Sequence, residues 1–404
     1  MAKHQSAVGG DLASVELFTG AGGLAMGTAL AGFAHRAVIE WNRDACDTLR
    51  ENAARIEYMH GWEIREGDVR QVDFRPFANT IDLIAAGAPC QPFSLGGKHR
   101  AYDDSRNMFP EVFRAVREAH PQAVIVENVK GLLRQAFRPY FDYIVAALAD
   151  PDLAQRPQET WQSHAKRLHT AARKPASSRI RYRVHHQLLN AADFGLPQRR
   201  ERVFIVAFRE DVGAEWPGLS PTHSEDGLLF DQWVSGEYWR EHGMTPPLVP
   251  ARLQVRVNRL WAQGRPMLTE RWRTVRDALR GLPEPDYAEH QSILNHVGNP
   301  GAKSYPGHTG SPLDEPAKTL KAGDHGVPGG ENMLRYLSGE VRYFSVREAA
   351  RLQGFPDDYR FSGSWSECLR QLGNAVPVDL ARAVATSVRS IIERPVARRM
   401  RVVA

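Results

Sequence analysis

The chain has 404 residues, of which 42% are hydrophobic and 25% charged, a composition typical of a folded globular protein with room for one large and one smaller domain. The formal net charge of +5 favours a polyanionic partner only weakly, and three scattered cysteines give neither a disulfide framework nor zinc-ligand spacing. No apolar stretch approaches the roughly 18 residues of a membrane span, and no signal-peptide core is present at the start, so we predict a cytoplasmic protein without bound metal or membrane contact.

Strand-like and helical stretches alternate through the first half of the chain. The helical stretches include 42–53 and 109–120. Alternation at these lengths predicts an α/β fold with a doubly wound, mostly parallel sheet that binds its ligands at the carboxyl ends of the strands. The predicted strands are 14–18, 37–40, 82–87, 123–128, 185–191 and 203–208.

A glycine-rich turn follows the first predicted strand. Without side chains, Gly20, Gly22 and Gly23 would let a ligand approach backbone amides at a helix start. Glu40 ends the second strand about 20 residues later, where a carboxylate can accept both hydroxyls of an adenosine ribose. A surface turn with solvated acids is the alternative, but the order of these residues favours an adenosine-bearing cofactor. Its predicted contacts are Phe18 and Trp41 on the adenine ring, Glu40 on the ribose and Asp68 on the adenine amine.

Three later motifs place reactive side chains at the same edge of the sheet. Cys90, between two prolines in GAPCQPFS, is either a small buried hydrophobe or a nucleophile. Glu127 ends the next strand, where burial raises a carboxyl pKa, or it caps the following helix. Gln198, Arg200 and Arg202 alternate along one strand face and suit a polar carbonyl and a phosphate, or pair with nearby acids.

The stretch 251–280 carries eight arginines against two acids, with two tryptophans interleaved. Arginine donates hydrogen bonds in pairs to phosphates and base edges, which favours a DNA-binding face. A solvated helical face with long side-chain stems is the alternative.

Six motifs resemble, in order and spacing, those of the DNA (cytosine-5)-methyltransferases of bacterial restriction-modification systems. They are FTGAGG, GAPCQPFS, ENVKGLL, QRRERVFIV, RLQGFPDDY and QLGNAVPV, in blocks spanning 14 to about 210 and 340 to 390. The resemblance implies a Rossmann-like methyltransferase sheet with a smaller target-recognition domain. It also implies methyl transfer from S-adenosyl-L-methionine to C5 of a cytosine in a specific double-stranded DNA sequence, with S-adenosyl-L-homocysteine as product.

The resemblance assigns the chemistry to particular residues. Cys90 adds to C6 of a cytosine flipped out of the duplex, and Glu127 contacts N3 and stabilises the adduct. Arg202 binds the cytosine O2, and Arg200 anchors a phosphate and the loop. The implied cofactor contacts are Phe18, Gly20, Gly22, Gly23, Glu40, Trp41, Asp68, Val69, Pro89, Phe109, Asn374, Ala375 and Val376.

DNA-facing residues are predicted on a loop, on strand ends and on a glycine-rich stretch. The loop 94–107 is expected to close over bound DNA, with a disordered surface loop as the alternative. The resemblance also implies that Asn128 holds the Pro-Cys turn in place. The residues of the glycine-rich stretch could instead form a turn between strands. The predicted DNA contacts are Gln91, Ser94, Lys98, Arg100, Asn128, Gln198, Lys318, Thr319, Lys321 and His325.

Three domain segments follow from the motifs. They are a catalytic domain over 1–210, with an insertion of unassigned role at 150–180, a target-recognition domain over 211–335, and a return segment over 336–404 whose last helix packs on the catalytic domain. We expect a monomer, with any cognate restriction endonuclease not held in a stable complex. The alternatives are a tRNA cytosine-5-methyltransferase, which the long recognition segment disfavours, and a catalytically silent DNA-binding homologue, which the complete set of catalytic residues disfavours.

Overall fold

The computed structural model describes residues 12–89, 107–173, 179–264, 270–285, 293–322 and 332–394. Six predicted site residues lie outside these ranges: Cys90, Gln91, Ser94, Lys98, Arg100 and His325. Within these ranges, none of the helices combines the length and apolar character that crossing a membrane requires.

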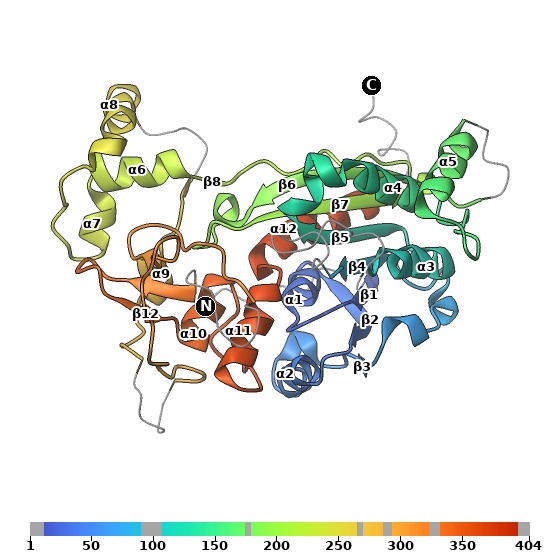
Figure 1. The fold of residues 1–404 in the computed structure, drawn as a ribbon, viewed down its shortest axis with the longest axis horizontal. Helices are drawn as coiled ribbons and strands as arrows, with labels where there is room; N and C mark the ends of the chain where they lie inside the picture. The colour runs from blue at the N-terminus through green and yellow to red at the C-terminus, as the bar shows by residue number, and fades with distance from the viewer. Residues whose placement is uncertain are drawn as a thin grey trace.

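A seven-stranded sheet forms the centre of the larger part of the molecule (Figure 1). Its strands are β1 (Leu12–Leu17), β2 (Phe33–Glu40), β3 (Ile64–Glu66), β4 (Leu83–Gly87), β5 (Ala123–Val129), β6 (Tyr182–Asn190) and β7 (Glu201–Arg209). They lie in the order β3-β2-β1-β4-β5-β7-β6, and β1 to β5 are parallel. The order reverses direction between β1 and β4, which is where sheets of this kind bind ligands.

The prediction of a doubly wound, mostly parallel sheet is confirmed. The final two strands pair antiparallel with each other, and β7 also runs antiparallel to β5. Only residues 191–200 separate β6 from β7. A crossover between parallel strands needs about a dozen residues or more, so this short connection forces the chain to turn back.

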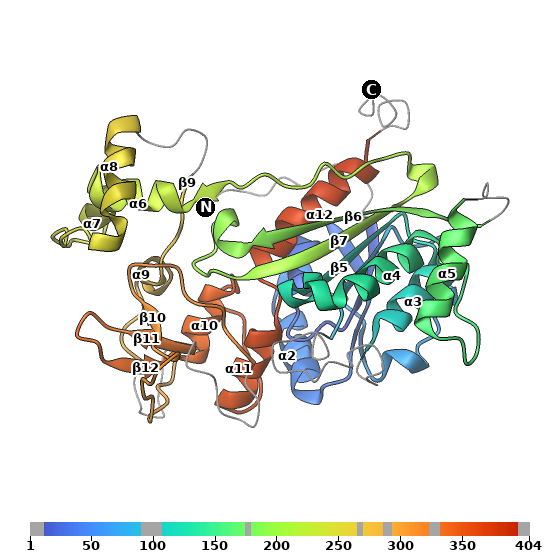
Figure 2. The ribbon, with the colours of Figure 1, turned by 45° about the horizontal axis from the view of Figure 1, so that its top comes forward.

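Helices cover both faces of the sheet (Figure 2). One face carries α3 (Phe109–Ala119) and α4 (Arg138–Ala149), which share a hydrophobic core with it. The opposite face carries α1 (Gly23–Leu30) and α12 (Val378–Ile392), which pack on each other and on a second core. The C-terminal helix therefore lies beside the first helix of the chain.

The return segment also reaches the glycine-rich turn. Helices α10 (Val346–Leu352) and α11 (Trp365–Asn374) share a core with α1 and α2 (Arg43–Ala53). The Tyr359 hydroxyl donates a hydrogen bond of 2.6 Å to the Ala21 carbonyl. The turn after β1 is thus held in part by residues from the far end of the sequence.

The predicted insertion forms a helix, α5 (Trp161–Ala172), that packs on α4. The Trp161 ring meets the Tyr140 ring edge-on at 5.3 Å between centroids. The Tyr143 hydroxyl and the His164 Nδ1 are 3.1 Å apart in a buried hydrogen bond. The insertion therefore extends the outer helical layer on this face of the sheet.

A separate lobe lies away from the sheet, at the left of Figures 1 and 2. It has a small core of its own around Trp239 and Trp272. Its elements are β8 (His223–Ser224), α6 (Glu225–Trp233), α7 (Glu237–Glu241), α8 (Gln254–Gln263) and β9 (Glu270–Arg271).

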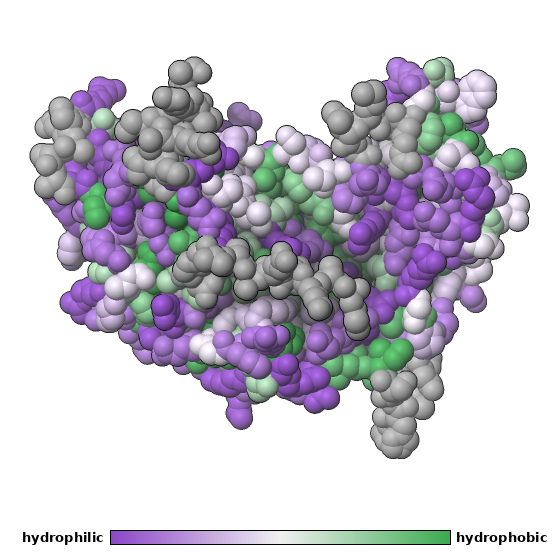
Figure 3. Space-filling model, turned by 180° about the vertical axis from the view of Figure 1, so that it is seen from behind, coloured by the Kyte–Doolittle hydropathy of each residue, from purple (hydrophilic) through white to green (hydrophobic). Residues whose placement is uncertain are grey.

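A three-stranded sheet and a short helix, α9 (Val275–Leu279), complete the smaller part. The strands are β10 (Ser311–Pro312), β11 (Met333–Arg335) and β12 (Val341–Tyr343), and β11 pairs antiparallel with β12. The predicted boundary between 335 and 336 falls inside this pair of strands. Seen from behind, the molecule is hollowed between two projecting parts whose surfaces are mostly hydrophilic (Figure 3).

One carboxyl group in β1 is buried without hydrogen bonds from the described residues to stabilise a negative charge. Glu16 is fully buried, and neither of its carboxylate oxygens has a hydrogen-bond partner in the described part of the chain. Burial raises the pKa of Glu16 well above its usual value. The folded state therefore binds a proton that the unfolded chain releases above its ordinary glutamate pKa, and folding stability falls as pH rises through that interval.

We expect Glu16→Gln to remove this loss and to stabilise the protein at pH 8 by about 1–3 kcal/mol relative to the natural chain, with little difference at pH 4.5. Thermal unfolding at both pH values measures the effect, and Glu57→Gln, at an exposed position, is the control. Equal pH dependence of Glu16→Gln and the natural chain would contradict it.

Candidate active site

A buried acid and an arginine meet at the ends of β5 and β7. Arg202 lies opposite Val129 in the antiparallel register, so its side chain reaches back to Glu127. The Arg202 Nε and the Glu127 Oε1 are 2.8 Å apart, and both side chains are almost fully buried. Burial raises the pKa of Glu127, although the charges of Arg202 and Arg200 oppose the shift. A raised pKa lets this carboxyl hold a proton nearer neutral pH, as a general acid requires.

The segment that leads to Cys90 runs beside this acid. Gly87, the last residue of β4, lies opposite Glu127 in the parallel register. The Asn128 Nδ2 donates a hydrogen bond of 3.1 Å to the Ala88 carbonyl. Asn128 therefore holds the chain just before Pro89, from the residue next to Glu127, while the predicted contact with Cys90 lies outside the described residues.

The turn after β1 is shaped by its junction with β2. Gly20 has a φ of 55°, and its N–H donates a hydrogen bond of 2.7 Å to the Glu40 Oε2. The other Glu40 oxygen accepts from the N–H groups of Trp41 and Asn42. Phe18 has a φ of 57°, a strained conformation for a residue with a side chain. A Cβ at Gly20 would meet nothing within 4 Å, so the space in front of this turn is open.

The other two glycines are also required by close contacts within the protein. A Cβ at Gly23 would lie 2.1 Å from the Val376 carbonyl oxygen, and a Cβ at Gly22 would lie 2.9 Å from the Leu49 side chain. These positions need glycine because other parts of the protein approach them closely. Whether a ligand also approaches the backbone of Gly22 and Gly23 stays a prediction.

The remaining predicted cofactor residues lie around the carboxyl ends of β1 to β4 and beside the return segment. Trp41 is 76% exposed. The Gly67 N–H donates to the Glu40 carbonyl, which brings Asp68 near Glu40, and Asp68 itself pairs with Arg70. Buried residues complete the set: Val69, Phe109, Ala375 and Val376, with Pro89 half-buried and Asn374 exposed.

Two residues predicted to contact DNA are fully buried. Arg200 donates hydrogen bonds to the carbonyls of Leu320, Gly373 and Ala375, and Gln198 is enclosed beside it. Neither side chain reaches the surface, so the predicted phosphate contact of Arg200 and DNA contact of Gln198 are corrected. Of the three alternating residues, only Arg202 lies within β7, and periodicity does not reveal which neighbouring segment covers the residues before a strand.

The later predicted DNA contacts lie on a segment that joins the two parts of the molecule. The Lys318 Nζ donates to the Thr309 hydroxyl, and the Thr319 hydroxyl donates to the Arg199 carbonyl. Lys321 is exposed, and its backbone N–H donates to the Asn332 side chain.

Most described arginines of the stretch 251–280 form ion pairs within the smaller part. These pairs join α8 to α6 and α9 to the neighbouring loop, so the arginines stabilise the lobe, and the predicted DNA face is not supported for them. They are Arg252 with Glu315, Arg256 with Glu225 and Asp226, Arg259 with Asp226, Arg271 with Asp277, and Arg276 with Asp314.

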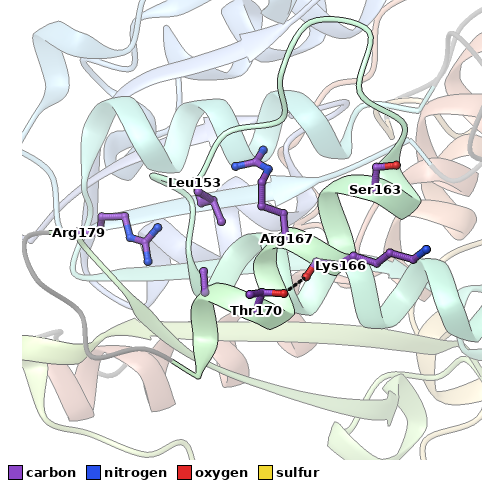
Figure 4. A pocket seen from close by; sticks show the side chains of 7 residues that line it. Leu153, Ser163, Lys166, Arg167, Thr170 and Arg179 are labelled. Carbon is purple, nitrogen blue, oxygen red and sulfur yellow. Dashed lines mark hydrogen bonds between the residues drawn. The ribbon is translucent and has the colours of Figure 1, made fainter.

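A cavity of about 480 Å³ lies on the insertion (Figure 4). Lys166, Arg167 and Arg179 line it. Arg167 pairs with Glu159 at 2.7 Å, and Arg179 pairs with Asp150 at 3.3 Å. Because two of its three cations are already neutralised by neighbouring acids, the cavity does not resemble an anion site.

No role for Gln353 or Tyr359 was predicted from the sequence, although both lie in the motif RLQGFPDDY. The structure places the Tyr359 hydroxyl on the glycine-rich turn, and the Gln353 Nε2 donates 2.5 Å to the Leu372 carbonyl. Their presence in a motif was the available signal.

The fold and the site define an α/β enzyme with its reacting groups at the carboxyl ends of the strands. The family model for C-5 cytosine-specific DNA methylases matches residues 12–152 and 163–390. The chain therefore belongs to that family and is a DNA (cytosine-5)-methyltransferase, which confirms the resemblance. The unmatched residues 153–162 fall within the predicted insertion.

Named relatives share most of their length with this chain. The Type II methyltransferase M.Eco47II of Escherichia coli is 32% identical over 396 residues, covering 94% of this chain and 79% of that protein. The Type II methyltransferase M.NgoMIV of Neisseria gonorrhoeae is 31% identical, covering 93% and 96%. Among solved structures, the Dnmt2 methyltransferase of S. pombe matches with a TM-score of 0.55 at 17% identity, covering 94% of this chain and 99% of that one, which shows a shared fold.

Proposed function

We propose that this enzyme transfers a methyl group from S-adenosyl-L-methionine to C5 of a cytosine flipped out of a specific duplex sequence, through a covalent bond to Cys90. The observation that carries the proposal is the buried pair of Glu127 and Arg202 beside the segment that leads to Cys90. The names of the relatives support a type II restriction-modification setting, with the enzyme acting as a monomer and any cognate endonuclease working separately.

The residues around the turn after β1 fit an adenosine-bearing methyl donor. Glu40 presents a buried carboxylate beside the open space at Gly20, and the exposed Trp41 ring offers a stacking surface. Phe18, Asp68, Val69, Pro89, Phe109 and the residues Asn374 to Val376 would complete the site. When bound, the donor supplies an electrophilic methyl group.

The chain's own residues supply the remaining chemistry. The Cys90 thiolate forms a bond to cytosine C6 while Glu127 donates a proton or hydrogen bond to N3 and Arg202 holds O2. Electron density at C5 then allows that carbon to take the methyl group. Loss of the C5 proton to a base and elimination of the thiolate restore the aromatic ring.

The test is incubation with duplex DNA containing 5-fluorocytosine and the methyl donor. Fluorine at C5 blocks the final elimination, so a covalent complex should persist in denaturing gels and vanish in Cys90→Ala. Burial raises the pKa of the Cys46 and Cys368 thiols to about 12, so neither is a competing nucleophile, and Cys368→Ala is the matched control. Transfer to tRNA with no complex on DNA would overturn the proposal.

Trp41→Ala is expected to weaken cofactor binding by about 1–3 kcal/mol, the magnitude of one lost stacking contact with an aromatic ring. Because the side chain is 76% exposed without the cofactor, the melting temperature of the free protein should change little. Calorimetric titration with S-adenosyl-L-homocysteine measures the effect, and Trp41→Phe should retain most of the affinity. An unchanged affinity in Trp41→Ala would place the adenine elsewhere.

A further inference from the structure

Three segments from distant parts of the chain meet at Arg200. Its Nη1 donates to the Leu320 carbonyl at 2.8 Å, and its Nη2 donates to the carbonyls of Gly373 at 2.7 Å and Ala375 at 2.9 Å. The side chain is fully buried. One rigid, permanently charged guanidinium thus connects residue 320 to the end of α11.

Gln198 reinforces the same junction. Its Oε1 accepts from the Leu320 N–H at 3.0 Å, and its Nε2 donates to the Leu352 carbonyl and the Gln353 Oε1, each at 3.2 Å. Both backbone groups of Leu320 are therefore bound by side chains from the segment just before β7.

The segment 317–322 is also in direct contact with the return segment. A Cβ at Gly373 would lie 2.2 Å from the Ala322 backbone nitrogen. On the other side, the Arg199 N–H donates to the Ala317 carbonyl at 2.8 Å. The segment is clamped between two other parts of the protein, so it cannot shift without moving at least one of them.

The two sides of this clamp have different proposed roles. The segment 317–322 carries Lys318, Thr319 and Lys321, which the sequence predicts to contact the target DNA. The carbonyls of Gly373 and Ala375 flank Asn374 and precede Val376, which we propose line the cofactor site. Arg200 touches neither ligand, yet it binds the backbone of both segments.

We propose that Arg200 is a positioning residue that couples target recognition to cofactor binding. The inference rests on the proposed function. A displacement of Leu320 by bound DNA moves the guanidinium and with it the carbonyls beside the cofactor, because leaving any of these buried carbonyls unpaired is costly. By linkage, the cofactor then strengthens target binding by the same factor as the target strengthens cofactor binding.

A buried arginine elsewhere in the chain provides a matched control. Arg347 is also fully buried and donates to three carbonyls, those of Leu294, Pro356 and Tyr359. None of these hydrogen bonds goes to the segment 317–322. Arg200→Lys and Arg347→Lys should therefore lower the melting temperature alike, while only Arg200→Lys affects the coupling.

The target site is first found by mapping 5-methylcytosine in a host that expresses the chain. Calorimetry then measures the Kd of S-adenosyl-L-homocysteine with and without a saturating duplex that carries this site. We expect the duplex to tighten binding about tenfold in the natural protein and in Arg347→Lys, and less than about twofold in Arg200→Lys. If Arg200→Lys does not fold, Gln198→Met, which removes the hydrogen bonds of Gln198 to Leu320 and Leu352 but leaves Arg200 in place, should lower this tightening in part.

The coupling role would be overturned if the duplex still tightened cofactor binding about tenfold in a folded Arg200→Lys, or if both arginine variants lost this tightening equally. Either result would leave the methylation proposal intact. The coupling role would also be overturned if the natural protein methylated DNA but bound S-adenosyl-L-homocysteine with the same Kd with and without the duplex. A natural protein that methylates no DNA would overturn the proposed function, and the inference with it.

Discussion

Glu127→Gln is expected to lower kcat by about 10²- to 10⁴-fold, the usual contribution of a positioned general acid. Glutamine keeps the size of the side chain and its hydrogen-bonding capacity, but it cannot transfer a proton to the base. Folding stability should also fall, because the largely buried Arg202 loses its charged partner, so the melting temperature is measured beside kcat. Single-turnover methylation of the mapped duplex measures the loss.

The pH dependence of kcat in the natural enzyme is a second test of Glu127 as the general acid. Because burial raises the pKa of Glu127, the acid form persists to higher pH than in an ordinary glutamate, and kcat should fall only above that pKa. Glu127→Gln should lack this alkaline limb. Glu201→Gln is the control, since Glu201 is also paired with a cation, Lys130, but is largely exposed. An unchanged kcat in Glu127→Gln would show that Glu127 is not the general acid.

The strands and the edge that carries the site could be predicted because each is encoded locally. A short apolar run such as 123–128 is buried on both faces of a parallel sheet, and the residue that ends it must lie at the ligand edge. Glu127 followed from this rule, and it lies two residues before the end of β5. The role of Asn128 followed from the resemblance, and its side chain bonds the Ala88 carbonyl.

Contacts between distant segments could not be predicted from the sequence in the same way. The pattern around Arg200 shows that its side chain shares a face with Arg202, but the covering carbonyls come from residues 320, 373 and 375. Likewise, the acids that neutralise Arg256 and Arg276 lie about 30 and 38 positions away along the chain. A single sequence does not reveal such pairings.

Gly23→Ala is expected to destabilise the fold by about 3 kcal/mol, at the upper end for an overpacked site. The added Cβ would lie 2.1 Å from the Val376 carbonyl oxygen and 3.3 Å from the Val376 nitrogen. Both are backbone atoms, so no side chain can rotate away, and the start of α12 must move from α1. A lower melting temperature, measured by circular dichroism, should accompany weaker cofactor binding because Val376 belongs to the proposed cofactor site.

Gly20→Ala separates these two effects within the same turn. Its Cβ would enter open space, so the cost to folding is the strain of a left-handed φ of 55°, about 1–2 kcal/mol. The methyl group would nevertheless project where the cofactor is proposed to bind. We therefore expect Gly20→Ala to lose proportionally more cofactor affinity than stability, and Gly23→Ala to lose more stability. The opposite order would mean that the return segment yields easily and that the ligand does not approach Gly20.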